Sequence, residues 1–356
     1  ARAYRRALTR KPELLSYGDP RGEPALRSAL AEMLRAKRGL RVGADDVLLT
    51  RGAQMALALL GRLLFRPGDV LAIEQLGYQP AVRALSQGVA SLRPVPLDRE
   101  GLRVDLLEAL CQREPVRAVY VTPHHQYPTT VTLSPARRMA LLALAQRHRF
   151  AIIEDDYDHE YHYEGQPILP LASADRHGVV LYVGTLSKVF APGTRVGYLV
   201  APSALREAAL GLRIDLDRQG DRVGEHALAE LMEDGELQRH VRRTQRTYRA
   251  RRDHLVAALR DQLGAWLEFE VPSGGMALWA SVSAELPVQA WLARAEELGV
   301  YTQAGRLFTP EARELPQLRL GYAALREEEL SAAVLRLKRA ALEVLPRATP
   351  RARRRT

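Results

Sequence analysis

The chain has 356 residues, of which 47% are hydrophobic, so it can bury one large core or two moderate ones. Its formal net charge is +10, but five arginines lie within residues 347–356, so the rest carries only a modest excess that suits a phosphate or an acidic substrate. Its apolar runs are shorter than the roughly 20 residues of a membrane helix, and its single cysteine, Cys111, excludes an intramolecular disulfide and a cysteine-based metal site. We expect a cytoplasmic protein that is not bound to a membrane.

Residues 1–47 are expected to form an exposed arm followed by an amphipathic helix over 25–37, packed with a small domain or a partner subunit. A strand is predicted at 46–50, and the turn Gly52-Ala53-Gln54 then opens an apolar helix over 55–64. A small-residue turn at the start of a helix leaves backbone amides free to bind an anion. The turn is therefore a candidate phosphate site, although such turns often only connect two elements.

Strands and helices alternate over residues 48–205, which predicts βαβ units and a mostly parallel sheet. The expected strands are 70–74, 117–123, 150–157, 179–184 and 196–200, and helices are expected at 104–113 and 136–148. Ligands of such sheets bind beyond the carboxyl ends of the strands. Tyr78, Asp155 and Lys188 all follow strands in this way.

Lys188 is unusual because only four of the 52 lysine and arginine residues are lysines. An ammonium group can lose its proton whereas a guanidinium group cannot, so a lysine in this arginine-rich chain suggests a reactive amine. The segment by itself is equally compatible with an exposed loop lysine that has no function.

The pattern changes after Pro202 to long, arginine-rich helical segments over 203–263, and strands then alternate with helices up to residue 345. We expect a large domain at 48–205 and a connecting helical segment at 206–235. A smaller α+β domain should follow at 236–346, with a disordered basic tail at 347–356.

Five motifs, in order over about residues 17–323, resemble those of the fold type I, aspartate-aminotransferase-like superfamily. The closest resemblance is to the aminotransferase-like domain of MocR-type regulators of the GntR family. The motifs are Tyr17–Gly22, Thr50–Gln54, His125–Thr129, Ile153–Asp158 and Gly184–Lys188 with Arg195. The resemblance implies an α/β fold in which a large domain, with a mostly parallel sheet of seven strands between helices, binds pyridoxal 5'-phosphate. A smaller α+β domain completes it.

The resemblance also implies roles for individual residues. Lys188 would form a Schiff base with the cofactor and then move the substrate proton. Asp155 would pair with the pyridinium nitrogen and Tyr157 with the phenolic oxygen, although Glu154 and Asp156 remain alternatives to Asp155.

The resemblance implies further residues around the cofactor ring and its phosphate. Tyr78 would stack on the ring, and Tyr17 would reach the phosphate of a neighbouring subunit, which implies a homodimer. The phosphate would be held by Gly52, Ala53, Gln54, Thr185, Ser187 and Arg195.

Two arginines compete for the substrate carboxylate, Arg319 and Arg306. We favour Arg319, because it alternates with Leu318 and Leu320 in a predicted strand, so its side chain must leave their apolar face.

The chain departs from the family at three positions: Tyr127 replaces an asparagine, Thr130 a glycine and Leu76 a proline. The predicted function is transamination between an amino acid, or a related amine, and a 2-oxo acid. The alternative is an effector-sensing domain of a MocR-type regulator, whose winged-helix domain, the part that would contact DNA, is not in this sequence. A third and weaker hypothesis is nucleic-acid binding by the basic tail.

Four histidines are considered as metal ligands: His124, His125, His159 and His162. His159 and His162 are three residues apart, but no further acid–histidine pair at catalytic spacing accompanies them. We therefore expect no metal site, and solvated or supporting roles for these side chains.

Overall fold

The computed structural model describes residues 2–87 and 89–345 and divides the chain into two compact units. The large unit consists of Ala1–Arg246, Ser273–Gly275 and Phe308–Pro310, and the small unit of Thr247–Pro272, Met276–Leu307 and the residues from Glu311 onward. The predicted disordered tail, 347–356, lies outside the described residues.

The large unit is built on a seven-stranded sheet in the order β1-β9-β8-β7-β6-β2-β3. Strands β3, β2, β6, β7 and β8 are parallel, whereas β9 runs antiparallel to both β8 and β1. The bounds are β1 Val47–Thr50, β2 Val70–Glu74, β3 Ser91–Val95, β6 Val116–Val121, β7 Ala151–Asp156, β8 Val180–Thr185 and β9 Gly197–Val200. The predicted fold class is confirmed.

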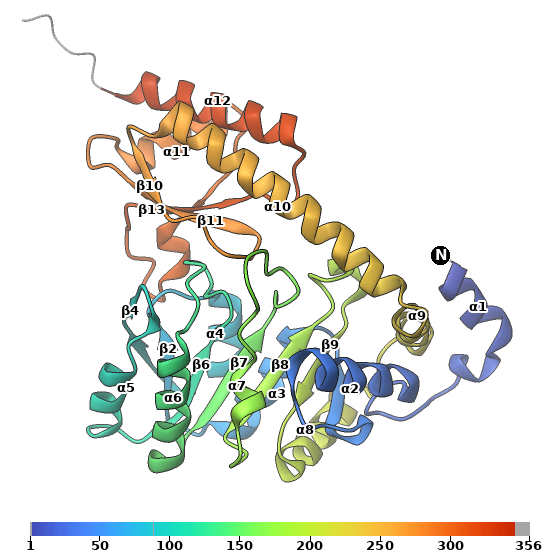
Figure 1. Ribbon diagram of the computed structural model, residues 1–356. Coiled ribbons are helices and arrows are strands. Elements are labelled where there is room, and N and C mark those ends of the chain that lie inside the picture. Colours follow the sequence, from blue (N-terminus) through green and yellow to red (C-terminus); the bar gives the residue numbers. More distant parts are fainter. Residues whose placement is uncertain (1, 88, 346–356) are drawn as a thin grey trace, which may run out of the picture. The chain divides into compact units, whose positions relative to one another are not determined.

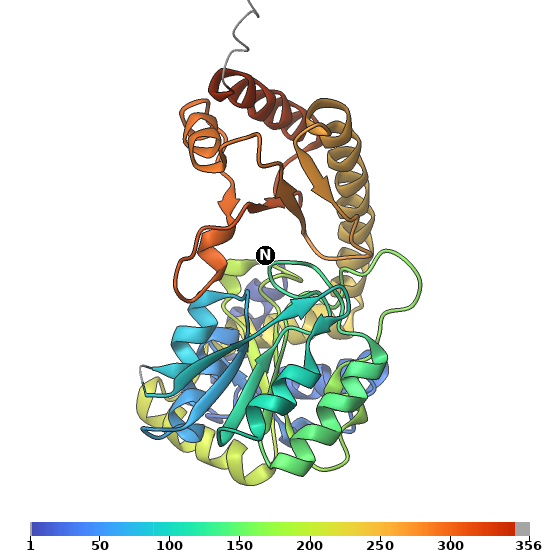
Figure 2. The ribbon, with the colours of Figure 1, turned by 90° about the vertical axis from the view of Figure 1, so that its left-hand side faces the viewer.

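Helices cover both faces of this sheet, as its nearly continuous apolar strands require (Figures 1 and 2). Helices α3 (Ala53–Leu64), α4 (Gln79–Ser86) and α8 (Ser203–Leu216) pack on one face. Helices α2 (Pro24–Arg38), α5 (Val104–Cys111), α6 (Pro135–His148) and α7 (Leu171–Ala174) pack on the other. Helix α6 begins as its sequence predicts: the Ser134 side chain accepts a hydrogen bond from the Arg137 amide.

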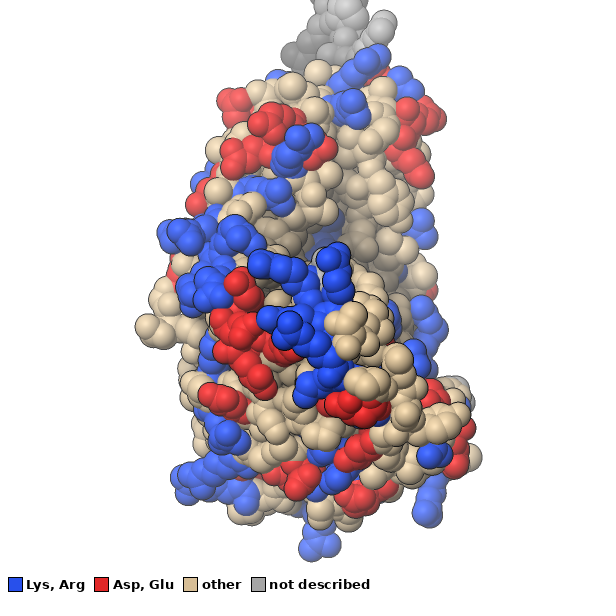
Figure 3. Space-filling model, turned by 90° about the vertical axis from the view of Figure 1, so that its right-hand side faces the viewer, with Lys and Arg blue, Asp and Glu red and all other residues tan. Residues whose placement is uncertain are grey.

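The N-terminal arm is more ordered than the sequence suggested. It forms helix α1 (Arg2–Arg10) and the 3-10 helix η1 (Pro12–Leu15), and α1 packs on α9 (Arg222–Glu233) through the buried Ala3 and Ala7. The Arg6 guanidinium pairs with Glu230 at 2.9 Å. Figure 3, which views the side on which α1 lies, shows basic and acidic side chains gathered together. The exposed-arm prediction missed this helix because its buried face consists only of alanines.

The division between the units also differs from the expected boundaries. Residues 1–47 and 206–235 belong to the large unit, since α2 and α9 pack together and α8 packs on α3. The division falls at Arg246, inside the continuous helix α10 (Glu236–Leu263). A helix that runs through the division keeps the same arginine-rich pattern on both sides, so the sequence gives no sign of it.

The small unit has a four-stranded antiparallel sheet in the order β10-β11-β13-β12. The strands are β10 Leu267–Phe269, β11 Ala277–Val282, β12 Gln303–Ala304 and β13 Gln317–Gly321. Helices α11 (Val288–Glu297) and α12 (Glu327–Val344) pack together, and the buried Trp291 indole donates a hydrogen bond to the Leu337 carbonyl at 2.8 Å. None of the described helices is long and apolar enough to cross a membrane.

Candidate active site

Three consecutive acidic residues end strand β7. Successive side chains of a strand point to opposite faces of the sheet, so these acids have different partners. Glu154 and Asp156 share one face of the sheet. Glu154 accepts hydrogen bonds of 2.8 and 2.9 Å from the backbone amides that open α7. Asp156 accepts from the Tyr182 hydroxyl at 2.5 Å and from Arg38 Nε at 3.3 Å. Both carboxylates thus already hold structural partners, which leaves Asp155 on the opposite face.

Asp155 is buried and only half satisfied. Its Oδ2 accepts a hydrogen bond from the Tyr120 hydroxyl at 2.8 Å, whereas Oδ1 has no hydrogen-bond partner among residues 2–87 and 89–345. Burial raises the pKa of this carboxyl to about 7, and the nearby Lys188 ammonium acts in the opposite direction. Asp155 can therefore accept a hydrogen bond from a cationic N–H group, which would favour its charged form.

Lys188 is close enough to Asp155 to influence its charge because β8 lies beside β7, with Val183 paired to Asp155. The lysine follows the end of β8 in an exposed turn before β9, as predicted. The Tyr161 hydroxyl donates a hydrogen bond of 2.7 Å to the Lys188 carbonyl, which holds the backbone of the turn. An amine is thus presented at the carboxyl end of the sheet, next to a buried acid.

The predicted phosphate turn lies at the start of α3. Gly52 caps the helix with φ 76°, a left-handed conformation that favours glycine. A Cβ at Gly197, the first residue of β9, would lie 2.4 Å from the Gly52 carbonyl carbon, so only glycine allows this approach. The close contact brings the Arg195 guanidinium to 3.1 Å from the position that a Gly52 Cβ would take. A helix N-terminus and a guanidinium side by side can hold a phosphate dianion.

The two predicted hydroxyl ligands differ in how they are already bonded. The Thr185 hydroxyl donates to the Val196 carbonyl at 3.2 Å and accepts from the Ser187 amide at 3.1 Å. The buried Ser187 Oγ has no hydrogen-bond partner within the described part of the chain. Ser187 is therefore the hydroxyl better able to donate to a phosphate oxygen.

Aromatic side chains form one wall of the site. The Tyr78 and Tyr127 rings meet edge to face with centroids 5.4 Å apart, and Tyr127 and Tyr157 are 6.1 Å apart. Burial raises the pKa of Tyr78. The Asp155 carboxylate also raises this pKa, and the Arg195 guanidinium lowers it. Tyr78 thus lies near both the acid and the phosphate turn, where a flat ring could stack on it.

The loop after β6 carries two of the departures from the family pattern. Tyr127 occupies the asparagine position and contacts Tyr78, so its ring adds to the aromatic wall. Thr130 replaces the glycine and has φ 65°, a conformation that is uncommon for a β-branched residue.

Three further predicted site residues are Tyr17, in the large unit, and Arg319 and Arg306. Tyr17 is 77% exposed, with the Arg218 guanidinium 4.7 Å from its ring centroid. Arg319 and Arg306 belong to the small unit. The Arg319 side chain lies on the face of β13 opposite to that of its buried neighbours, and it donates a hydrogen bond of 3.2 Å to Gln303. Arg306 pairs with Glu314 at 3.7 Å.

Sequence reasoning missed Tyr120, which holds Asp155 in place. It lies on β6, 35 residues before its partner, and reads as an ordinary core residue in an apolar strand. Only the parallel pairing of β6 with β7 brings the two side chains together.

The site fits a phosphorylated pyridine cofactor: it offers an amine, a buried acid with one unpartnered oxygen, and a helix N-terminus beside a guanidinium. A sequence profile of the family "Aminotransferase class I and II" matches residues 1–337. The chain belongs to the class I and II aminotransferase family. Pyridoxal 5'-phosphate is the cofactor of this aminotransferase.

Individual relatives of the aminotransferase fall into two groups. Aromatic-amino-acid aminotransferase 1 of Thermococcus litoralis is 32% identical over 331 residues, which cover 91% of this chain and 79% of that enzyme. The probable rhizopine catabolism regulatory protein MocR of Rhizobium meliloti is 32% identical over 314 residues, which cover 88% of this chain but 63% of the regulator. The chain thus spans about four fifths of the enzyme and just under two thirds of the regulator.

A solved structure matches nearly the whole aminotransferase chain. The α-aminoadipate aminotransferase LysN from Thermus thermophilus superposes with a TM-score of 0.89 at 28% identity, covering 96% of this chain and 87% of that one. That crystal structure contains N-(5'-phosphopyridoxyl)-L-leucine.

Proposed function

We propose that this aminotransferase moves the amino group of an amino acid, or a related amine, to a 2-oxo acid, with Lys188 as the attachment point of the cofactor. The observation that carries the proposal is the pair formed by Lys188, at the end of β8, and the half-satisfied Asp155, at the end of β7. When bound, pyridoxal phosphate supplies an electron sink for the charge left at the substrate Cα.

The protein's own groups would divide the remaining work. The Lys188 amine would be the base that takes the proton from the substrate Cα and the acid that gives it back on the cofactor side of the amino nitrogen. Asp155, oriented by Tyr120, accepts the ring N–H, and the buried carboxylate keeps that nitrogen protonated. The Gly52 turn, Ser187 and Arg195 hold the phosphate, which fixes the ring against Tyr78.

The test is to reconstitute the full chain with pyridoxal phosphate, reduce it with borohydride and map the labelled peptide by mass spectrometry. We expect a visible absorption band and label on Lys188 alone. Lys188→Ala should abolish both, whereas Lys37→Ala, a change at an exposed lysine, should leave both intact. Adding an amino acid to the wild type should remove the band and release a 2-oxo acid. Label on another lysine would overturn the assignment.

Arg319 is our proposed ligand for the substrate carboxylate, with Arg306 as the alternative. The support for Arg319 is its position on β13, where the apolar side chains on either side are buried and its own side chain emerges on the other face. The planar guanidinium can bind a carboxylate through two parallel hydrogen bonds.

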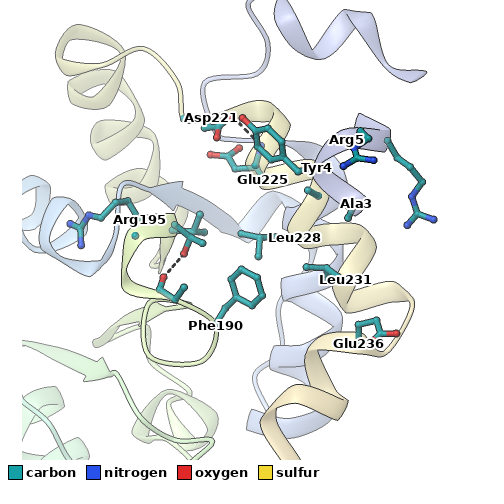
Figure 4. A pocket seen from close by; sticks show the side chains of 18 of the residues that line it. Ala3, Tyr4, Arg5, Phe190, Arg195, Asp221, Glu225, Leu228, Leu231 and Glu236 are labelled. Atoms are coloured by element: carbon teal, nitrogen blue, oxygen red, sulfur yellow. Dashed lines mark hydrogen bonds between the residues drawn. The ribbon is translucent and has the colours of Figure 1, made fainter. Parts of the chain in front are cut away.

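A homodimer, in which Tyr17 approaches the partner's phosphate, is part of the proposal. Two observations support it: Tyr17 is 77% exposed, and a cavity of about 1060 Å³ opens beside the phosphate turn. Figure 4 shows Arg195 and Phe190 on one side of this cavity and Tyr4 of α1 on the other. A partner's arm could enter there. Light scattering should give a dimer, and a monomer that still binds cofactor tightly would contradict this.

The second candidate function is that of an effector-sensing domain of a transcription regulator. Tyr127 in place of asparagine supports it, as does the similarity to MocR. A sensing domain should bind the cofactor and change its absorption with an amino acid, but release no 2-oxo acid over many turnovers. DNA contact in that case would need a domain that is not in this sequence. A cytoplasmic location is part of both proposals.

A further inference from the structure

Two loops at the carboxyl ends of neighbouring strands bring four histidines together. His124 and His125 follow β6, and His159 and His162 follow β7. The rings of His124 and His159 are stacked with centroids 4.3 Å apart, and those of His124 and His125 are 4.4 Å apart. His124, His125 and His159 are at most 5% exposed. Of the two roles expected from the sequence, solvated or supporting, burial excludes the first for these three side chains, because the two loops cover each other.

The ring nitrogens of this cluster are poorly satisfied. Both nitrogens of His124, Nε2 of His125 and Nδ1 of His162 have no hydrogen-bond partner among the residues that the structure describes. A buried imidazole that leaves its donor or acceptor unpaired loses the hydrogen bonds it makes in water, which destabilises the folded state. A single ligand that binds several of these nitrogens at once would satisfy the cluster.

Three of the histidines bring ligand atoms close together. One nitrogen each of His124, His125 and His162 lies within 4.8 Å of the other two. Nitrogens at 2.0–2.1 Å around a tetrahedral ion are roughly 3.4 Å apart, so modest side-chain rotations would complete the geometry. Space is kept free by Gly274, since a Cβ at that residue would lie 2.4 Å from His125 Nε2.

A carboxylate supports the central ligand. Asp158 Oδ1 lies 3.0 Å from His125 Nδ1, and both side chains are 1% exposed. A proton on Nδ1 toward this carboxylate leaves the lone pair of Nε2 free to bind an ion. Metal-binding histidines are commonly oriented in this way, with the second ring nitrogen donating to a carboxylate.

We propose that His124, His125 and His162 bind one divalent transition-metal ion of the zinc class, with Asp158 orienting His125. This reverses the expectation from the sequence, which considered all four histidines and predicted no metal site, because only His159 and His162 had a suggestive spacing. Three imidazole ligands suit Zn²⁺, Co²⁺ or Ni²⁺ and leave a fourth position for a solvent molecule. Its ligands are not among the groups proposed to bind the cofactor, and the site does not depend on the proposed transamination.

The ion would link the loops that carry Tyr127 and Tyr157. Tyr157 already donates a hydrogen bond of 2.9 Å to the carbonyl of His125, so the metal ligand and the site tyrosine share a backbone anchor. The role we assign to the ion is therefore structural, holding the two loops together. Because an ion that binds only the folded state stabilises it by mass action, it should raise the melting temperature.

The test uses the full chain without an affinity tag, stripped with chelator and then titrated with Co²⁺ and with Zn²⁺. We expect about one ion per chain, the intense visible absorption of tetrahedral Co²⁺, and a melting temperature higher by about 2–6 °C with Zn²⁺. His162→Asn and, separately, His125→Asn should each lower the affinity at least tenfold. His177→Asn, a change at an exposed histidine, should bind as the wild type does.

Circular dichroism of each variant distinguishes loss of the ion from loss of the fold. Because His162 is only half-buried, the fold should tolerate His162→Asn better than His125→Asn. Failure of the stripped wild type to bind Co²⁺ would overturn the proposal. Co²⁺ binding that persists unchanged in both His162→Asn and His125→Asn would also overturn it, because the ion would then be elsewhere.

Discussion

Replacing Gly197 by alanine tests whether the turn at Gly52 is the phosphate site. The new Cβ would lie 2.4 Å from the carbonyl carbon of Gly52 and 2.5 Å from the amide nitrogen of Ala53, both backbone atoms. The first turn of α3 must therefore retreat by about 1 Å to restore ordinary contact distances. A shift of that size breaks a hydrogen bond of normal length, and one bond to a charged group contributes roughly 1.5–3 kcal/mol.

We therefore expect Gly197→Ala to weaken pyridoxal phosphate binding roughly 10- to 150-fold. Binding of pyridoxal, which lacks the phosphate, should change far less. Gly193→Ala is the matched control, since a Cβ there meets nothing within 4 Å. Affinities come from titration of the visible absorption, and circular dichroism verifies the fold. If a folded Gly197→Ala protein keeps its preference for the phosphorylated cofactor, the turn at Gly52 does not bind the phosphate.

Three further predictions concern other parts of the chain. Thr130→Gly should raise the free energy of unfolding by up to about 1 kcal/mol, because glycine adopts the left-handed φ of 65° without strain. Thr130→Ala should not raise it, and denaturant unfolding of both variants measures the difference. Burial raises the pKa of Glu74 to about 7, whereas the same carboxyl in the unfolded chain loses its proton above about pH 4. The contribution of Glu74 to the free energy of unfolding therefore falls as the pH rises to about 7. The melting temperature of cofactor-free Glu74→Gln, relative to wild type, should thus be higher at pH 8 than at pH 5, with the exposed Glu285→Gln as control. Arg319→Lys should weaken amino-acid binding by about 1.5–3 kcal/mol and leave cofactor binding unchanged; the same result from Arg306→Lys, with none from Arg319→Lys, would reverse our assignment.

The sequence predicted those features that depend on neighbours along the chain. The order of strands and helices followed from apolar runs and their breaks, and Lys188 and the Gly52 turn were found because each directly follows a strand. The same reasoning placed three acids at the end of β7 but left the choice of Asp155 open, because their partners come from distant segments.

Features that depend on packing between distant segments were missed. Tyr120 reaches Asp155 only through the pairing of β6 with β7, and the histidines assemble only where the loops after those strands meet. Helix α1 was missed for a different reason: its buried face is made of alanines, which give a weak apolar pattern in a basic segment.

The three acids at the end of β7 make this strand more sensitive to changes in length than to changes in residue type. Loss of a single residue from the strand would rotate every later side chain to the opposite face. Asp156 would then meet Tyr120 while Arg38 and Tyr182 lost their acceptor, so one deleted codon would disturb both the active site and the core. Homologous proteins with this site should therefore vary in the amino acids of β7 more readily than in its number of residues.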